Sequence, residues 1–560
     1  MTLSRRRALL SFGSLSAIPA FGGSTTAPAQ GLRFEHGVAS GDPLGERVIL
    51  WTRISGSDAP VEVSWQIATD MEFWHIVSQG KVTTDASRDF TVKTDAAGLK
   101  PGVDYVYRFQ CGRLTSPIGR TRTLPDKTND VVLAMVTCSL HPNGYFNGYR
   151  AIADLKRVDA VVHLGDYIYE YGAEPTDYGM GNGRNLGRIP EPPYEIITLA
   201  DYRTRHAQYK RDPDLQAAHA RAPWITVFDD HEIANNPWTD GAANHNPEKG
   251  EGSWWDRKAA ALKAYREWMP IRDPKPRQLT ETIYRSFRFG DVAELIMLET
   301  RLLARTKQLD YGDLAVKADG TADYDGFRKQ LNDPGRQLLG AEQRQWLAAT
   351  LASSVADGMR WQVFGNQVVM ARSPGPDIDS LIDPQAFDAA LKVLPADTQA
   401  KLQAMRGLFT PARAFPFNLD AWDGYPAERE RFYGLIQQAG ARAVVVSGDS
   451  HNAWANNLAD ASGRHVAVEM GVTALTSPTT WFDKWLPNLP LAKTTAAQNP
   501  EVLAAADDHN GFVRLTLTRD RMTGEWMALD TITAKPFACT PKATFTADAL
   551  AVGVGPLRQV

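Results

Sequence analysis

The sequence predicts an α/β protein with two packed mixed β-sheets flanked by helices, preceded by a small antiparallel β-sandwich. Before about Pro125, short runs alternate apolar and polar residues, which is typical of half-buried strands. After Pro125, short apolar runs alternate with helical segments, the pattern of an α/β domain. Late runs look like antiparallel strands, so mixed or paired sheets fit better than a purely doubly wound sheet.

The segment 30–125 is expected to form the N-terminal sandwich. Its alternating runs are separated by turn-rich breaks, and no helical period of useful length appears. The stretch 99–107 reads Leu-Lys-Pro-Gly-Val-Asp-Tyr-Val-Tyr, which resembles the corner of fibronectin type III domains, where a Tyr hydroxyl pins the corner to the backbone. We expect a structural role for it. The predicted strands are Val48 to Thr52, Val61 to Trp65 and Tyr105 to Phe109.

The segment 126–560 is expected to form the α/β domain. Two long stretches, 171–193 and 235–253, are rich in Gly, Pro, Asn and Asp, and we expect them to border a site. The predicted buried strands are Val131 to Val136, Ala160 to Leu164, Ile225 to Phe228, Ala293 to Leu298, Trp361 to Phe364 and Ala443 to Val446. The predicted helices are Asp256 to Trp268, Ala341 to Leu351 and Ala427 to Gln438. The predicted antiparallel strands are His465 to Met470, Val513 to Leu517 and Glu525 to Leu529.

The first 29 residues predict an export signal. A basic start, Ser4-Arg5-Arg6-Arg7, precedes a weakly apolar run and the sequence Ala27-Pro28-Ala29, which fits a cleavage site near Ala29. The paired arginines resemble a twin-arginine signal, whose translocase carries proteins already folded around a cofactor; a generic signal peptide is the alternative. The mature protein is therefore expected in the periplasm or secreted, with no transmembrane anchor, because no later apolar run reaches about 18 residues.

Composition argues against some partners. The chain has 560 residues, 43% of them hydrophobic and 22% charged, and a formal net charge of −4. No global basic field is present, so no nucleic-acid-binding surface is expected and a small substrate is the default. The three cysteines are too few for a disulfide framework.

Four polar clusters each follow an apolar strand-like run. Open α/β sheets place their ligand sites at the carboxyl ends of strands, and carboxylates gathered there repel one another unless a cation binds. A single strand-end Asp is more often a helix cap, but four such clusters together predict a metal site. The clusters read Val-Thr-Cys-Ser-Leu-His at 136–141, His-Leu-Gly-Asp-Tyr-Ile-Tyr-Glu at 163–170, Phe-Asp-Asp-His-Glu at 228–232 with Asn235 and Asn236, and Ser-Gly-Asp-Ser-His-Asn at 447–452.

These clusters resemble the motifs of a known family. Gly165-Asp166-x-x-Tyr169, Asp230-His231-Glu232 and Gly448-Asp449-x-His451 are similar to blocks of the calcineurin-like metallophosphoesterases. Cys138, Asp-Asp-His-Glu and Gly-Asp-x-His resemble more closely the PhoD-type alkaline phosphatases, also called alkaline phosphatase D. The resemblance extends over nearly the whole mature chain and implies a four-layer metallophosphoesterase domain at 126–560 after a PhoD-type N-terminal domain at 30–125.

The first metal position is expected around Asp166, the natural carboxylate to bridge two metals. Tyr169 offers a phenolate, a hard donor that ferric iron stabilises. By analogy with the wider family, Cys138 and His451 complete the shell of the first metal. A thiolate beside a phenolate suits iron far better than magnesium. Cys138 as an inert buried thiol is the alternative.

The second metal position is expected to be richer in oxygen. Asp230 and Asp449 stand where the parent family has neutral Asn and His, which favours hard cations such as Ca²⁺. Asn236 is a further oxygen donor. The resemblance implies Fe³⁺ and Ca²⁺ as cofactors, with Zn²⁺ or Mn²⁺ as alternatives.

His231 is expected to contact a phosphoryl oxygen of the substrate or to protonate the leaving group; a hydrogen-bonded structural His is the alternative. We do not expect His141 to be functional. Glu299 departs from the family, which commonly has Leu-Asp-Thr-Arg where this chain has Leu298-Glu299-Thr300-Arg301, so any contact made by the shorter carboxylate is in question.

Together these features predict an exported alkaline phosphatase that acts on small phosphorylated substrates. It would hydrolyse phosphate monoesters, diesters or both with a metal-bound hydroxide in a multinuclear metal site, releasing phosphate. A phospholipase-D-like phosphodiesterase is the alternative within hydrolases. A non-catalytic secreted binding protein on the same scaffold is a further alternative.

Overall fold

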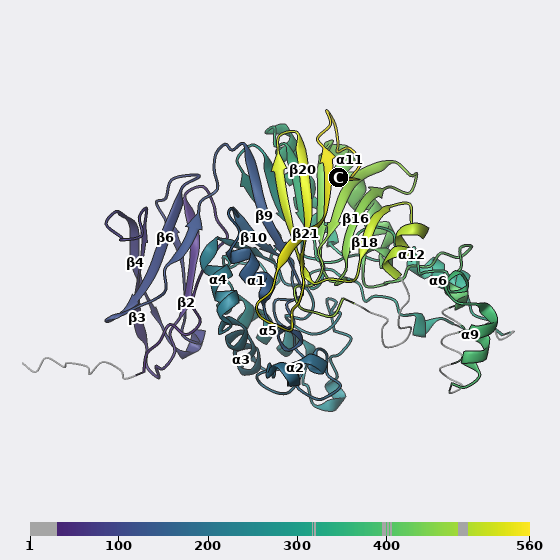
Figure 1. Cartoon of the computed structure of the whole chain (residues 1–560), viewed down its shortest axis with the longest axis horizontal. Helices are drawn as coiled ribbons and strands as arrows, with labels where there is room; N and C mark the ends of the chain where they lie inside the picture. The colour runs from purple at the N-terminus through teal and green to yellow at the C-terminus, as the bar shows by residue number, and fades with distance from the viewer. Residues whose placement is uncertain are drawn as a thin grey trace, which may run out of the picture.

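The computed structural model describes residues 31–315, 317–318, 321–394, 399, 403, 406–479 and 491–560. The predicted export signal, 1–29, lies outside the described residues. Three β-sheets make up the framework, with ten, seven and five strands. The five-stranded sheet lies at one end of the molecule, and the two larger sheets lie side by side with helices around them (Figure 1).

The N-terminal region is a β-sandwich, as predicted. One of its layers is the five-stranded sheet, in the order β4-β3-β6-β7 with β8 paired to β6. The other layer is formed by β1, β2 and β5, and apolar residues of both layers share one core. The strands are β1 (Val38–Gly41), β2 (Arg47–Arg53), β3 (Val61–Ala68), β4 (Ile76–Thr84), β5 (Thr91–Ala97), β6 (Asp104–Cys111), β7 (Leu114–Thr115) and β8 (Gly119–Arg122); η1 (Ala86–Arg88) is a single helical turn.

The predicted tyrosine corner is present. The hydroxyl of Tyr105, in β6, accepts a hydrogen bond from the backbone N–H of Lys100 at 2.9 Å. The Tyr105 side chain is buried in the sandwich core. The motif therefore holds the turn before β6, as its resemblance to the fibronectin corner implies.

One layer of the sandwich also belongs to the ten-stranded sheet, which the sequence did not predict. That sheet has the order β22-β21-β20-β19-β9-β10-β11-β1-β2-β5, and Gly41 of β1 pairs in parallel with Trp224 of β11. A Cβ at Gly41 would lie 2.2 Å from the carbonyl oxygen of Pro270, so this junction requires glycine. The N-terminal region is thus joined to the larger domain by backbone hydrogen bonding.

The rest of the ten-stranded sheet is mixed. Strands β9, β10 and β11 run parallel, while β19 and β20 add antiparallel strands beside β9, as predicted. The strands beyond the N-terminal region are β9 (Asp130–Val136), β10 (Ala160–His163), β11 (Trp224–Thr226), β19 (Gly511–Thr518), β20 (Arg521–Leu529), β21 (Cys539–Asp548) and β22 (Arg558–Gln559).

The seven-stranded sheet is also mixed, in the order β12-β13-β14-β15-β17-β16-β18. The prediction of an antiparallel strand near His465 to Met470 is only half correct, because β17 pairs parallel with β15 and antiparallel with β16. β17 lies where the parallel part of the sheet meets the antiparallel part, so it has one parallel and one antiparallel neighbour. The strands are β12 (Arg285–Phe289), β13 (Ala293–Met297), β14 (Trp361–Gly365), β15 (Ala443–Ser447), β16 (Ala453–Ala459), β17 (His465–Gly471) and β18 (Val502–Ala506).

The main core lies between the two large sheets, because one apolar cluster contains residues of β9 and β10 as well as of β13 and β15. Helices cover their outer faces, which completes the four layers. On the ten-stranded sheet these are α1 (Asn147–Ala153), α3 (Leu199–Lys210), α4 (Pro213–Arg221) and α5 (Trp254–Trp268). On the seven-stranded sheet they are α7 (Gly340–Ala356) and α11 (Pro426–Ala439). The three predicted helices are therefore found as α5, α7 and α11.

The remaining helices are short and lie in the connections. They are α2 (Met180–Leu186), α6 (Tyr324–Leu331), α8 (Ile378–Leu381), α9 (Pro384–Leu391) and α12 (Leu491–Gln498), with the turns η2 (His141–Asn143), η3 (Pro247–Lys249), η4 (Tyr311–Asp313) and η5 (Trp422–Gly424). Among the described residues, no helix has the length and apolar character needed to cross a membrane.

Candidate metal centre

The loops that follow four parallel strands bring the predicted ligands together. Cys138 follows β9, Asp166 follows β10, Asp230 follows β11, and Asp449 and His451 follow β15. The first three strands belong to the ten-stranded sheet and β15 to the seven-stranded sheet, so the site lies where the ends of the two packed sheets meet. This is the strand-end location that the sequence predicts.

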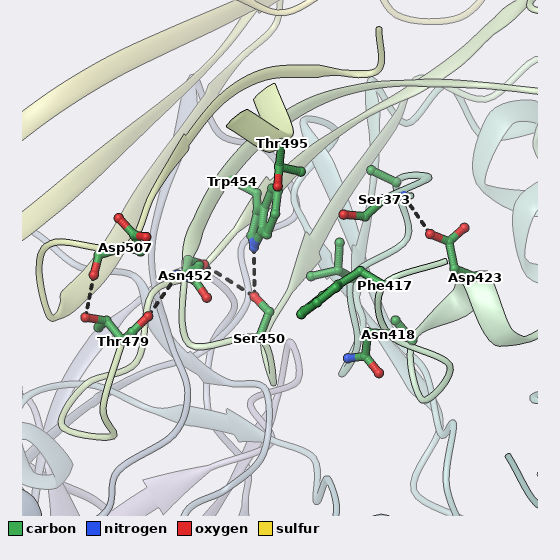
Figure 2. A pocket seen from close by; sticks show the side chains of 13 residues that line it. Ser373, Phe417, Asn418, Asp423, Ser450, Asn452, Trp454, Thr479, Thr495 and Asp507 are labelled. Atoms are coloured by element: carbon green, nitrogen blue, oxygen red, sulfur yellow. Dashed lines mark hydrogen bonds between the residues drawn. The ribbon is translucent and has the colours of Figure 1, made fainter. Parts of the chain in front are cut away.

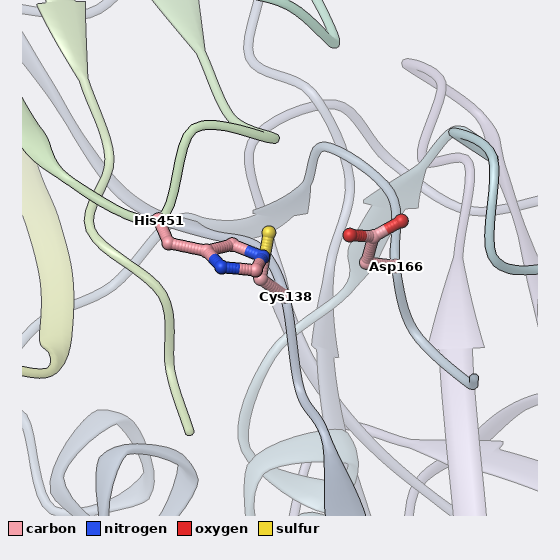
Figure 3. A group of neighbouring side chains, drawn as sticks. All are labelled: Cys138, Asp166 and His451. Carbon is pink, nitrogen blue, oxygen red and sulfur yellow. The ribbon is translucent and has the colours of Figure 1, made fainter. Parts of the chain in front are cut away.

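Potential metal-binding side chains form three linked groups. Within each group the ligand atoms lie within 4.8 Å of one another. Cys138, Asp166 and His451 make up the first group (Figure 3). Asp166, Asp230 and His231 make up the second group, and Asp229, Asp230 and Asp449 the third. Because Asp166 belongs to two groups, its position fits the bridging role predicted for it.

Four residues of these groups, together with the predicted ligand Asn236, hold an unusual backbone conformation. The φ angles are +57° at Cys138, +57° at Asp166, +47° at Asn236, +60° at Asp449 and +63° at His451. A side chain in the left-handed region costs about 1 kcal/mol or more per residue and persists only where the surrounding structure enforces it. Residues of four separate loops share this strain, which only the surrounding fold can maintain.

Burial and mutual repulsion shape the protonation of the first group. Burial, together with the negative charge of Asp166, raises the pKa of the Cys138 thiol well above its ordinary value. Burial and the charge of Asp230 raise the pKa of Asp166 as well. Burial lowers the pKa of His451 to about 4, so its ring is neutral and able to ligate. A thiol, a carboxyl and a neutral imidazole gathered at one buried point fit a cation site.

Tyr169 lies beside the first group. Its hydroxyl donates a hydrogen bond to Oδ2 of Asp166 at 3.0 Å and lies 2.7 Å from Oγ of Ser477. Its ring centroid is 4.3 Å from that of His231. Burial and the charge of Asp166 raise the pKa of the phenol, so only a cation would make it a phenolate ligand.

Arg301 faces the third group, and the sequence reasoning did not assign it a role. Its fully buried guanidinium lies 2.5 Å from Asp229, 3.1 Å from Asp449 and 2.6 Å from Asp420. One positive charge therefore meets several carboxylates. Buried oxygens of Asp229 and Asp230 accept no hydrogen bond from the described part of the chain, which leaves them available to a cation.

Asn236 reaches this part of the site through its backbone. Its N–H donates to Oδ2 of Asp230 at 3.0 Å, and its carbonyl accepts from the side chain of Gln308. The structure thus places Asn236 beside the predicted second position and shows its backbone contact.

His231 is held by a residue that the sequence reasoning did not single out. Its Nδ1 lies 2.7 Å from Oε2 of Glu170. The other oxygen of that carboxylate, Oε1, accepts hydrogen bonds from the N–H of Asn235 and the side-chain amide of Asn244. Burial opposes protonation of His231, but the charges of Asp230, Glu170 and Asp166 outweigh it and raise the pKa well above the ordinary value. These charges therefore favour the protonated form of His231. Glu170 directly follows the predicted ligand Tyr169, and this position in the sequence is what could have identified it as a site residue.

Glu232 is a structural clamp. Its carboxylate accepts hydrogen bonds from the backbone N–H groups of Tyr167, Asp229 and Asp166, at 2.6, 2.9 and 3.1 Å. These donors belong to the loops after β10 and β11. One buried side chain therefore fixes the spacing of two ligand loops.

Glu299 is also structural. Its carboxylate accepts hydrogen bonds from the N–H groups of Arg301, Leu302 and Leu303, at 2.8, 2.6 and 3.0 Å. It belongs to none of the three ligand groups, and it orders the turn that carries Arg301. His141 likewise belongs to none of them and packs on the ring of Tyr209, with the centroids 5.3 Å apart.

Both predicted border loops contact the site. The hydroxyl of Tyr178, in the first stretch, lies 3.1 Å from Nδ1 of His451, and the two rings stack. The ring of Tyr171 lies 5.3 Å from that of His231. The second stretch supplies Asn236 and Asn244. The first stretch is not entirely irregular, since it contains α2.

Comparison with known proteins gives consistent matches. The family model described as "PhoD-like phosphatase" matches residues 133–526, and "PhoD-like phosphatase, N-terminal domain" matches residues 20–125. The alkaline phosphatase D of Bacillus subtilis (strain 168) is 34% identical over 531 residues, covering 91% of this chain and 80% of that protein. A solved structure described as "Structure of PhoD" superposes with a TM-score of 0.75 at 31% identity, covering 94% of this chain and 92% of the other.

Proposed function

This chain belongs to the PhoD-like phosphatase family, and from that premise we propose that it is an exported, metal-dependent phosphoric ester hydrolase. The proposed reaction is the hydrolysis of phosphate monoesters, diesters or both at a multinuclear metal site. We further propose that 30–125 is an N-terminal domain and 126–560 the catalytic domain.

The linked ligand groups are the observation that carries the proposal. Asp166 and Asp230 each belong to two groups, so adjacent cations would share carboxylates. Two-metal sites that hydrolyse phosphate esters hold their ions about 3.5–4 Å apart, a spacing that shared carboxylates suit. The positive φ angles at Cys138, Asp166, Asp449 and His451 support a functional arrangement, since structure alone gives no reason for this shared strain.

The donor chemistry supports two kinds of cation. Cys138, Asp166, Tyr169 and His451 would hold the first ion, and a thiolate with a phenolate favours Fe³⁺. Asp230, Asp449 and Asn236 would hold the second, where oxygen donors favour Ca²⁺. Asp229 lies beside the second set and is a further carboxylate donor. Bound cations supply the Lewis-acid charge that polarises the phosphoryl group and activates water.

The protein's own residues would divide the remaining work. His231, held protonated by neighbouring carboxylates, would contact the phosphoryl oxygens and give its proton to the departing alkoxide. Glu170 positions the ring by accepting from Nδ1, which leaves Nε2 to face the substrate. Arg301 would balance the charge of Asp229, Asp420 and Asp449 and hold them in place.

The proposal includes export by the twin-arginine translocase and release near Ala29, to the periplasm or beyond the cell. It rests on the paired arginines at the start of the chain and on the buried ligand set. A buried ligand set is most simply loaded with metal while the protein folds, which would take place before transport. Replacing Arg5, Arg6 and Arg7 with lysine should stop export while leaving the accumulated protein active.

The direct test is hydrolysis by the metal-loaded protein and by an Asp166→Asn variant. We expect release of p-nitrophenol from p-nitrophenyl phosphate, from bis(p-nitrophenyl) phosphate, or from both, and none with Asp166→Asn. Asp240→Asn changes an exposed carboxylate in the stretch 235–253 and should retain activity. Hydrolysis of phosphatidylcholine alone would favour the phospholipase-D-like alternative. A protein that binds no metal when metal is supplied, and that hydrolyses none of these esters, would favour the binding protein.

A further inference from the structure

A hollow of about 90 Å³ lies at the seven-stranded sheet, lined in part by Trp454 of β16 (Figure 2). Phe417 and Trp454 flank it, and Val369, Ala371 and Ala421 supply further apolar wall. These residues come from the segment after β14, the segment before α11 and the start of β16.

The polar groups of the hollow are largely engaged with the protein. Nε1 of Trp454 donates to Oγ of Ser450 at 2.8 Å, and the side chain of Asn452 donates to the carbonyl of Thr479 at 3.0 Å. The carboxylate of Asp423 accepts from the N–H of Ser373 and from Arg429. The accessible surface that remains is therefore mainly apolar, which suits a hydrocarbon group.

Two stretches of chain that line the hollow also reach the metal centre. Ser450 and Asn452 line it, and His451, a member of the first ligand group, stands between them in the chain. Asn418, also in the lining, accepts the N–H of Asp420, which pairs with Arg301. His451 is one residue from both Ser450 and Asn452, and neighbouring Cα atoms are about 3.8 Å apart, so the hollow lies beside the metal centre.

The size of the hollow limits what it can take. An engineered apolar cavity of about 150 Å³ holds benzene, so a space of about 90 Å³ suits a smaller group. A chain of three or four carbons fits better than a complete fused ring or a nucleoside. A phosphate ester bound at the centre has such a group available in its alcohol part.

We propose that this hollow is a subsite for the short alkyl part of the alcohol in a phosphate ester, so that Phe417 and Trp454 make the enzyme select alkyl esters. This inference rests on the proposed function, since it assumes that the phosphoryl group binds at the metal centre. It adds a preference for substrate that neither the ligand set nor the family match provides.

The test compares methylphosphonate with butylphosphonate as inhibitors of the wild-type enzyme. Their P–C bond is not hydrolysed, and they differ only in the length of the carbon chain. Because each buried methylene strengthens binding about three- to fourfold, the inhibition constant for butylphosphonate should be at least about tenfold lower. The reporter reaction is hydrolysis of p-nitrophenyl phosphate or of its diester, whichever the enzyme turns over.

Two variants locate the effect. Phe417→Ala removes one wall, and Ser373→Leu fills the hollow, so each should reduce the ratio of the two inhibition constants to about one. Using both guards against a folding defect in either. Trp74→Ala removes an aromatic side chain that is 80% exposed and far from the hollow, and it should keep the wild-type ratio.

Equal inhibition by both phosphonates, or a preference that survives in both Phe417→Ala and Ser373→Leu, would overturn the alkyl subsite while leaving the hydrolase proposal intact. Failure of the wild-type enzyme to hydrolyse either reporter ester would instead overturn the proposed function and this inference with it.

Discussion

Glu170 determines how His231 can work. The carboxylate fixes the orientation of the ring through Nδ1 and stabilises its positive charge, together with Asp230 and Asp166. Both effects depend on the burial of Glu170, which is completely inaccessible to solvent. In the proposed mechanism the pair is an acid with its positioning residue, and the two contributions can be separated experimentally.

We expect Glu170→Gln to lower kcat about 10- to 100-fold, as is usual when a group that orients a functional histidine is lost. The variant should also shift the pH profile. Because the carboxylate raises the pKa of His231, activity that needs protonated His231 is present below that pKa and lost as pH rises through it. Removing the charge lowers the pKa, so the alkaline limb of kcat/KM should move to lower pH.

The control for this prediction is Glu174→Gln, which changes an exposed glutamate in the same stretch of chain. It should leave kcat and the pH profile unchanged. A Glu170→Gln enzyme that is slower but has the wild-type alkaline limb would show that Glu170 has only a structural role.

For single residues, the sequence predicts the metal ligands better than it predicts the side chains that hold those ligands in place. Cys138, Asp166, Asp230 and His451 stand at strand ends in a recognisable order. Arg301 follows the predicted strand Ala293 to Leu298, but an arginine there does not indicate a metal site, and Asp420 lies in a segment without a strand-end pattern. Only tertiary packing brings the two together at the site. Long-range ion pairs of this kind leave no periodic signal in one sequence.

The turn after β13 shows how an element positions the site. Glu299 caps three consecutive N–H groups, and the turn delivers Arg301 to Asp229 and Asp449. Gln343 of α7 in turn donates to the carbonyl of Glu299, and its Oε1 accepts the N–H of Glu299. The family commonly has the shorter Asp where this chain has Glu299. In this chain the longer carboxylate holds the backbone of the turn.

We expect Glu299→Ala to lower the free energy of unfolding by about 3 kcal/mol or more, since it leaves buried N–H donors without acceptors. Denaturant unfolding measures the change. Glu342→Ala removes an exposed glutamate at the start of α7 and should change stability by less than about 0.5 kcal/mol. Metal content per folded molecule should stay near the wild-type value in both, and a selective loss of metal in folded Glu299→Ala would show that Glu299 serves the ligands directly.

Elements were predicted well where their patterns are local. The strands β9, β13 and β15 and the helix α5 follow from apolar runs and helical spacing. The parallel pairing of β17 with β15 could not be predicted, since strand direction depends on partners far apart in the chain. For the same reason, the sequence did not predict the pairing of β1 with β11.

For the whole molecule, that pairing means that the N-terminal region supports the catalytic sheet. Asp42 strengthens the junction, because its buried carboxylate lies 2.6 Å from Arg285 and accepts the N–H of Arg272. Trp51 of β2 donates to the carbonyl of Glu267 in α5. The family match to two successive models therefore describes segments that share a sheet.

We expect deletion of residues 31–125 to abolish folding of the remainder. The deletion would expose the edge of β11 and the apolar surface now covered by β1 and β2, which favours aggregation. Soluble yield, circular dichroism and ester hydrolysis would test it against the intact chain prepared in the same way. A soluble, cooperatively folding and active fragment would show that the shared sheet is dispensable.

The central claim is a mixed metal centre with a ferric position marked by Cys138 and Tyr169. Elemental analysis combined with a visible absorption spectrum of the native protein tests it most directly. We predict iron together with calcium, and a phenolate-to-iron charge-transfer band that disappears in Tyr169→Phe but persists in Tyr171→Phe, whose ring also lies beside His231. An active protein that contains only zinc and shows no such band would contradict the account.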